Sequence, residues 1–115
     1  MVVGNMKDLN SNIIQSPQAQ GASIKVLVGA QEGWKDHVMR VLQLEPGGHS
    51  PKHAHDWPHI NYIISGKGTL YLDGKLHELT AGSYAYVPAN ELHQFSNAGD
   101  EPFQFMCIVP DYGHQ

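Results

Sequence analysis

Four histidines in two clusters are the residues of this chain best suited to chemistry. His53, His55 and His59 fall close together, and His93 follows after a gap. Neutral imidazole nitrogen binds first-row transition metals strongly, and four convergent histidines can hold one ion without a thiolate or carboxylate ligand. The two clusters therefore predict a mononuclear metal site with His53, His55, His59 and His93 as its ligands.

The local sequence indicates how these side chains would converge. Alternate side chains of a strand share a face, so His53, His55 and His59 would point the same way if a strand continued. Pro58 cannot donate a ladder hydrogen bond, so we expect an edge, bulge or bend that turns His59 toward the ion. His93 would arrive from a distant strand. The other four histidines lack this context and are interpreted as solvated: His37, His49, His77 and His114.

The elements that must position the histidines are short strands. Runs rich in Val, Ile, Tyr, Phe and Leu lie between glycines and prolines, and few are long enough for a helix. The runs cover residues 24–29, 36–44, 59–65, 68–72, 75–79, 83–87, 94–97 and 103–109. Short strands at regular spacing with turn signals between them predict an all-β sandwich or barrel.

The chain of 115 residues has the size of one domain. Residues 1–22 are polar and weakly patterned, so we expect an N-terminal arm that is ordered against a partner, followed by a barrel over residues 23–112. Three turn signals accompany the runs. Asp73-Gly74 predicts a type I′ hairpin, Pro46-Gly47-Gly48 is expected to break the run before the histidines, and Asn90 is expected at positive φ.

Two stretches around the histidines resemble the two sequence motifs of the cupin superfamily. The first motif is matched, with a histidine in place of its glutamate, by Gly47, His53, His55, His59 and Gly66. The second is matched, with an asparagine in place of a glycine, by Gly82, Pro88, Asn90, His93 and Asn97. The resemblance covers residues 47–97. It implies a single-domain jelly-roll β-barrel, similar to the small four-histidine cupins, with one divalent ion inside: manganese, iron, copper, nickel or zinc.

The histidine in place of the glutamate changes the charge of the predicted site. Four neutral histidines leave a divalent ion with its full +2 charge, which should raise its Lewis acidity, favour anionic ligands and raise its redox potential. Arg40, a candidate catalytic residue, lies in an apolar run. It would bind a substrate carboxylate if it faces the interior, or lie on an outer edge if it does not.

Four more residues are candidates for the wall of a substrate pocket. Phe105 and Cys107 share one face of the last run, where Cys107 is a buried small hydrophobe or, less favoured, a soft extra donor. Trp57 lies between two candidate ligands and would line the pocket or pack in the core or an interface. Val38 lies in the same run as Arg40.

Charge and composition restrict the partners. The net charge of −4 and the scattered Lys and Arg residues argue against nucleic acid and against a membrane surface. One cysteine excludes an internal disulfide, and no signal peptide or membrane-spanning stretch is recognisable, so we expect a cytoplasmic protein. We also expect a homodimer, because the edge strands of so small a barrel need to be covered.

The resulting function hypothesis is a metal-dependent oxidoreductase, similar to a dioxygenase, that acts on a small anionic or aromatic molecule. Asp56 and Glu91 flank the ligands, but strand parity turns Asp56 away from His55, so the ion itself would do the chemistry. Two alternatives stay open: a metal-dependent isomerase or lyase, and a non-catalytic module that binds a metal or metabolite. A structural barrel with an incidental site is the least favoured interpretation.

Overall fold

Strands provide nearly all regular structure in residues 1–114, the part of the chain that the computed structural model describes. The nine strands are β1 (Asn12–Ile13), β2 (Gln20–Val28), β3 (His37–His49), β4 (His59–Ser65), β5 (Lys67–Leu72), β6 (Lys75–Thr80), β7 (Tyr84–Val87), β8 (His93–Asn97) and β9 (Phe103–Pro110). The helical elements in these residues are single 3₁₀ turns: η1 (Met6–Asp8), η2 (Ala30–Glu32) and η3 (Asp111–Gly113). None of the helices in this range is long and apolar enough to cross a membrane.

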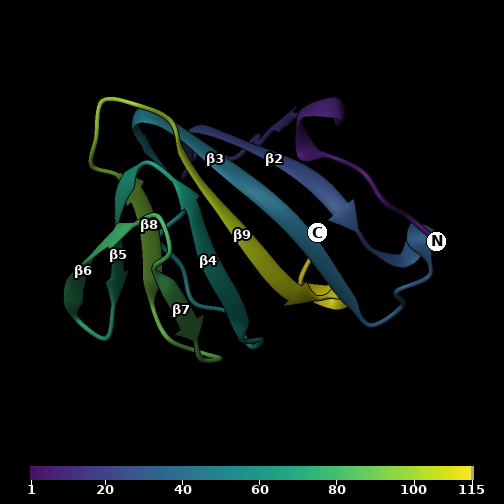
Figure 1. The fold of residues 1–115 in the computed structure, drawn as a ribbon. Coiled ribbons are helices and arrows are strands. Elements are labelled where there is room, and N and C mark those ends of the chain that lie inside the picture. Colours follow the sequence, from purple (N-terminus) through teal and green to yellow (C-terminus); the bar gives the residue numbers. More distant parts are fainter. Residues whose placement is uncertain (115) are drawn as a thin grey trace.

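The strands form a nearly closed antiparallel β-barrel of the jelly-roll type (Figure 1). Their order is β6-β5-β8-β3-β9-β4-β7, while β2 pairs with β3 and β1 pairs with β2. The strand β3 joins the two halves of the barrel, because it pairs with β2 and β9 along most of its length and reaches β8 at its end, where His49 lies opposite Ser96. The predicted all-β barrel is confirmed.

The predicted runs coincide with β2 to β9 to within a few residues, except at the end of β3. This strand continues through Pro46-Gly47-Gly48 to His49 instead of stopping at Leu44, so the predicted break is wrong. The pairing of β3 with β2 skips from Leu44 to His49, and Gly47 has φ 79°. The extra residues are absorbed as an irregularity that bends the strand without ending it.

The other two turn predictions are confirmed. Asp73 (φ 55°) and Gly74 (φ 69°) both have positive φ, and Leu72 pairs with Lys75 across them, as a type I′ hairpin requires. Asn90 has φ 67°. This residue lies just before β8 and therefore helps to set where His93 begins its strand.

Alternation along β4 and β9 separates the interior of the barrel from its outer face. On β9, Phe103, Phe105, Cys107 and Val109 are all buried. On β4, His59, Asn61 and Ile63 are buried, while the residues between them are exposed. The period of two thus carries two polar side chains of β4 into an otherwise apolar interior.

The N-terminal segment lies partly against the barrel. The strand β2 begins at Gln20, and Ile14 and Ala19 pack against the core. The backbone N–H of Ile14 also donates to the carbonyl of Ala22 at 2.9 Å. That a partner orders the rest of the expected arm stays a prediction.

Candidate metal centre

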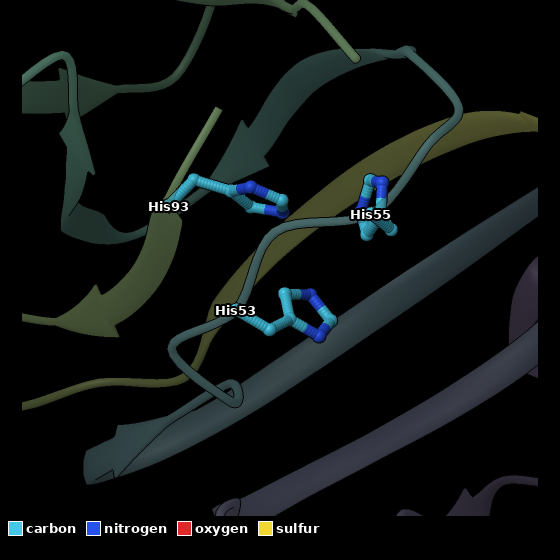
Figure 2. A group of neighbouring side chains, drawn as sticks. All are labelled: His53, His55 and His93. Carbon is cyan, nitrogen blue, oxygen red and sulfur yellow. The ribbon is translucent and has the colours of Figure 1, made fainter. Parts of the chain in front are cut away.

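Three histidines, which range from exposed (His53) to buried (His93), bring their ligand atoms together. One ring nitrogen from each of His53, His55 and His93 lies within 4.8 Å of the others, and this group could hold a metal ion. Figure 2 shows the three rings around a shared space, with His93 on its strand and His53 and His55 on a loop. The loop covers residues 50–58 and connects β3 to β4.

The loop is fixed to β8 by backbone hydrogen bonds. The N–H of Ser50 donates to the carbonyl of Phe95 at 2.9 Å. His53 and His93 exchange two backbone hydrogen bonds, of 3.1 Å and 2.9 Å, and form an isolated β-bridge. The sequence interpretation considered a continuous strand through His53 and His55, whereas the structure has one bridge and a loop. His53 and His93 approach each other because their backbones are paired.

A second set of contacts holds His55. The N–H of Asn90 donates to the carbonyl of His55 at 2.6 Å, so the positive-φ turn before β8 also anchors the loop. The His55 ring stacks on Trp57, with ring centroids 4.3 Å apart and planes inclined by 2°. The Trp57 ring in turn meets the edge of Tyr112 at 5.8 Å. The position of His55 is therefore set by both the β7–β8 turn and the C-terminal segment.

Hydrogen bonds at Nδ1 determine which nitrogen of each ring is free. His55 Nδ1 lies 2.7 Å from the carbonyl oxygen of Trp57, and His93 Nδ1 lies 2.8 Å from that of Glu91. A carbonyl can only accept, so both Nδ1 atoms carry the proton and each neutral ring keeps its lone pair on Nε2. Metal-ligating histidines are typically held in this way through their other nitrogen.

His59 lies next to this group and follows the same pattern. It is buried on β4, and its Nδ1 lies 2.6 Å from Asn61 Oδ1, which accepts. Its Nε2 lies 3.2 Å from His93 Nε2. With both Nδ1 atoms protonated, two lone pairs face each other, an arrangement that a cation between them would relieve. Two nitrogens bound at about 2.1 Å to one ion are separated by roughly 3.0–3.4 Å, so the spacing fits a shared ion.

Burial keeps these rings uncharged. Desolvation lowers the pKa of His59 to about 3, although the hydrogen bond to Asn61 opposes the shift. Desolvation, with the neighbouring His93 and His55, lowers the pKa of His53 to about 4. The pKa of His93 is lowered by the same burial. All three rings are thus neutral at pH 7 and have a lone pair available for a metal.

The histidines open into a cavity of about 800 Å³. Arg40, Trp57, Phe105 and Cys107 line it together with His53, His55, His59 and His93. Residues of β2, β3, β4, β8 and β9 contribute, as do the 14–18 segment and the C-terminal residues 112–114. Among the described lining residues there is no aspartate and no glutamate. The cavity therefore combines an apolar wall with neutral and cationic polar groups.

Val38, which was expected in the pocket, lies elsewhere. It is 2% exposed and is part of the hydrophobic core. It shares the inner face of β3 with Arg40, but it lies one alternation nearer to the start of the strand and packs against Gly29. The alternation of side chains along β3 places Val38 and Arg40 on the same face. It does not say how far along β3 the cavity extends, which depends on where the 50–58 loop lies.

Arg40 faces inward and meets a histidine that was interpreted as solvated. Arg40 Nη1 lies 3.0 Å from His114 Nδ1. Arginine can only donate, so His114 accepts at Nδ1, and burial followed by the charge of Arg40 lowers the pKa of His114. No local signal in the sequence marks His114. It follows the last strand, and the turn of the chain after β9 brings it to the cavity.

Asn61 is the other site residue that the sequence interpretation missed. It lies two residues after His59 on β4, so strand parity alone could have placed both on one face. Its Nδ2 and the Nε of Arg40 are buried without a hydrogen-bond partner among the described residues. Cys107 lies between them, and burial raises the pKa of its thiol, which stays protonated.

The structure is thus a small antiparallel β-barrel with a group of histidines that could hold a metal ion. The Cupin domain family matches residues 40–109, more than half of the chain. The chain therefore belongs to the cupin family, as the resemblance implied.

Three similar proteins cover almost the whole chain. Auxin-binding protein 1 of Arabidopsis thaliana is 30% identical over 94% of this chain and 58% of its own length. Polyketide synthase CurC of Streptomyces cyaneus is 27% identical over 97% of this chain and 75% of its own length. The solved structure of the polyketide cyclase RemF from Streptomyces resistomycificus superposes with a TM-score of 0.89, at 25% identity, over 96% of this chain and 79% of that one.

The family members similar to this chain have diverse roles. Their names include a glucose-6-phosphate isomerase and a dimethylsulfoniopropionate lyase besides the cyclase and the auxin-binding protein. This chain spans 58%, 34% and 50% of the lengths of the first three curated relatives. Membership of the family therefore establishes the fold but does not determine the reaction.

Proposed function

We propose that this chain is a metal-dependent cupin enzyme that acts on a small organic anion. In this proposal His53, His55, His59 and His93 hold one divalent transition-metal ion. The observation that carries it is the opposition of His59 Nε2 and His93 Nε2 at 3.2 Å, with both Nδ1 atoms committed to oxygen acceptors. When bound, such an ion would polarise a substrate oxygen as a Lewis acid or, if it is redox-active, exchange electrons with the substrate.

The protein's own groups would bind and orient the substrate. The aromatic side chains of Trp57, Phe95 and Phe105 line the cavity and suit a ring or hydrocarbon body. Arg40 supplies the one permanent positive charge among the described lining residues. The 14–18 segment and the C-terminal residues lie at the same cavity and would limit the access of water to it.

We favour a ring-forming or isomerising reaction of a carbonyl compound. The two relatives CurC and RemF, which cover 97% and 96% of this chain, are named as a polyketide synthase and a polyketide cyclase. Carbonyl-rich substrates of that kind can be activated by Lewis-acid polarisation without a change of oxidation state.

Oxidation of the substrate is the second candidate. Its support is the absence of any carboxylate among the described residues that line the cavity, because proton-transfer chemistry commonly uses a positioned acid or base. His114 could supply a base, but its Nδ1 already accepts from Arg40.

The deciding experiment compares zinc, manganese and iron forms of the same preparation against a panel of aryl carboxylates and poly-carbonyl compounds. Product formation would be followed by mass spectrometry and oxygen uptake by electrode. Turnover by the zinc form without oxygen consumption supports ring formation or isomerisation. Turnover confined to the iron or manganese form, with oxygen uptake, supports oxidation. Binding without turnover in every form would favour a binding module instead of an enzyme.

A further inference from the structure

Three polar side chains form a row across the cavity wall. Arg40 on β3 pairs with Cys107 on β9, and Cys107 pairs with Asn61 on β4. All three line the cavity that also contains the histidines. Neighbouring strands are about 4.8 Å apart, so the backbones of Arg40 and Asn61 are separated by roughly 10 Å, and both side chains reach toward the Cys107 thiol between them. We call Arg40, Cys107 and Asn61 the donor row.

The two ends of the donor row each hold an unused hydrogen-bond donor. Arg40 Nε and Asn61 Nδ2 are buried and have no partner among residues 1–114, and Asn61 is 0% exposed. Buried donors without a partner are rare in native proteins, and each one calls for an explanation. Two of them in one cavity wall, next to a candidate metal centre, point to a ligand that brings acceptors.

The orientation of both donors is fixed by their other contacts. Asn61 Oδ1 is occupied by His59 Nδ1 at 2.6 Å, so its Nδ2 faces the other way. Arg40 Nη1 is directed to His114 Nδ1 at 3.0 Å, which leaves Nε to a separate partner. Neither donor can be satisfied by turning the side chain without losing an existing hydrogen bond.

The charge of the cavity selects the kind of acceptor. The chain has a net charge of −4, yet its described cavity lining has no carboxylate and contains the Arg40 guanidinium. Within residues 1–114 no acidic side chain forms an ion pair with Arg40, whose Nε stays unpartnered. A partly buried guanidinium whose Nε lacks an acceptor is costly, and a carboxylate would supply both a counter-charge and acceptor oxygens.

We infer that the donor row is a carboxylate-binding subsite, in which Arg40 Nε and Asn61 Nδ2 donate to the oxygens of a small aryl carboxylate. The ring of this ligand would lie against Trp57 and Phe105, and its remaining polar groups would face the histidines. Cys107 supplies a small, uncharged side chain between Arg40 and Asn61, and both of these side chains also approach its thiol. The inference deepens the proposed function, on which it rests for the position of the metal, although the carboxylate contacts use protein donors only.

The test uses Trp57 as its reporter. The chain has two tryptophans, so a Trp34→Phe background leaves only Trp57, which lines the cavity. Phenylacetate and the uncharged phenylacetamide would be titrated into the zinc-loaded and metal-free proteins while Trp57 fluorescence is followed. We expect phenylacetate to bind more tightly than phenylacetamide in both forms, because the selectivity comes from the donor row.

Two variants remove the donors separately. Arg40→Met removes the charge and Nε, and Asn61→Asp keeps an oxygen acceptor for His59 while replacing the Nδ2 donor by an acceptor. Each should weaken phenylacetate binding about 10- to 100-fold, and the zinc content of Arg40→Met should be unchanged. Arg40→Lys, which keeps the charge but lacks Nε, should fall between Arg40→Met and the unsubstituted protein. Lys75→Met, a charge loss on exposed β6, is the matched control and should bind normally.

The result separates this inference from the proposed function. Selective phenylacetate binding by a protein that takes up no zinc would support the donor row and contradict the metal-dependent function. Zinc uptake with equal binding of phenylacetate and phenylacetamide would overturn the donor row and leave the metal centre intact. Absence of phenylacetate binding at millimolar concentration, or unaltered binding in both Arg40→Met and Asn61→Asp, would also overturn it.

Discussion

At the level of single residues, the Nδ1 contacts of three histidines decide what the site can bind. His55, His59 and His93 each have an oxygen acceptor at Nδ1, so each presents an Nε2 lone pair. In the proposed site, His59 would contribute a neutral nitrogen donor where the family's motif has a glutamate. A divalent ion held by four such rings keeps its full charge and has a higher affinity for anions than one with a carboxylate ligand.

Removal of any one of the four rings should reduce metal binding. We expect single alanine variants of His53, His55, His59 and His93 to lose affinity for zinc by more than about tenfold, because each loses one of four donors. Elemental analysis after dialysis against a fixed zinc concentration measures the loss. His77→Ala is the control, since His77 is exposed on β6 and its Nε2 lies 3.3 Å from the Leu72 carbonyl oxygen. Equal zinc content in all five variants would contradict the assignment.

The sequence predicts the candidate ligands better than it predicts their surroundings. Several histidines at the spacing of a known motif indicate metal binding more strongly than any single histidine does. His53, His55 and His93 could therefore be predicted as ligands, and the structure brings them together. Asn61 was accessible through strand parity with His59. His114 was not, because its contact with Arg40 depends on how the chain turns after β9, which no local pattern encodes.

At the level of elements, the barrel brings distant segments together through backbone pairing. Bonds from the 50–58 loop to β8 align His53 with His93, and β4 presents His59 and Asn61 from the other side. Strand positions follow from apolar runs and turn residues, so they were predictable. The continuation of β3 to His49 was not, because glycine and proline end a strand in most contexts but here form an irregularity opposite β2.

Close packing between β5 and β9 gives a test at this scale. A Cβ on Gly68 would overlap the ring of Phe103, which is fully buried. Gly68→Ala should therefore lower the free energy of unfolding by about 1–3 kcal/mol, the usual cost of overpacking. Urea denaturation followed by far-UV circular dichroism measures it. Gly4→Ala is the control because nothing lies within 4 Å of its Cβ position, and a stability of Gly68→Ala equal to that control would mean that β5 and β9 pack differently.

At the level of the whole molecule, the lowered pKa values of His53 and His59 couple stability to pH. In the unfolded chain His53 and His59 titrate near 6.5, whereas folding lowers the pKa to about 4 and about 3. Between these values the unfolded chain binds more protons, so acidification favours unfolding. The metal-free protein should keep its full stability above pH 6.5 and lose it progressively as pH falls toward 3. Urea midpoints at successive pH values measure this loss of stability. We expect His59→Gln to show a weaker pH dependence, and His77→Gln to show the same pH dependence as the unsubstituted protein.

Bound metal should add to this pH dependence. An ion that binds only the folded chain raises its melting temperature by mass action, and protons compete with it for the same Nε2 atoms. We expect zinc to raise the melting temperature at pH 7 and to lose that effect at acidic pH. A melting temperature that chelation leaves unchanged at pH 7 would show that the ion is not coupled to folding.

The outer face of β4 and β7 carries an exposed row of apolar and aromatic side chains. Ile60 (51% exposed), Tyr62 (46%), Tyr84 (82%) and Tyr86 (61%) form the cross-strand pairs Ile60–Tyr86 and Tyr62–Tyr84. Ile60 and Tyr62 also pair with Ile108 and Met106 of β9. A contiguous row of this kind without a charged side chain is typical of an interface. Among residues 1–114, β7 ends the strand order of the sheet, so its outer edge has no strand of this range beside it.

We expect a second copy of this chain to cover that row and form a homodimer. A two-fold axis lets one surface pack on itself, so the aromatic pairs need no separate complementary partner, and the uncovered edge of β7 would be shielded at the same time. Light scattering should give twice the chain mass at micromolar concentration. Tyr86→Lys, which places a charge within the row, should shift the protein to monomer. Leu76→Lys, equally exposed but on β6 outside the row, should stay dimeric. A monomer mass for the unaltered protein, or dissociation by both substitutions alike, would refute this interface.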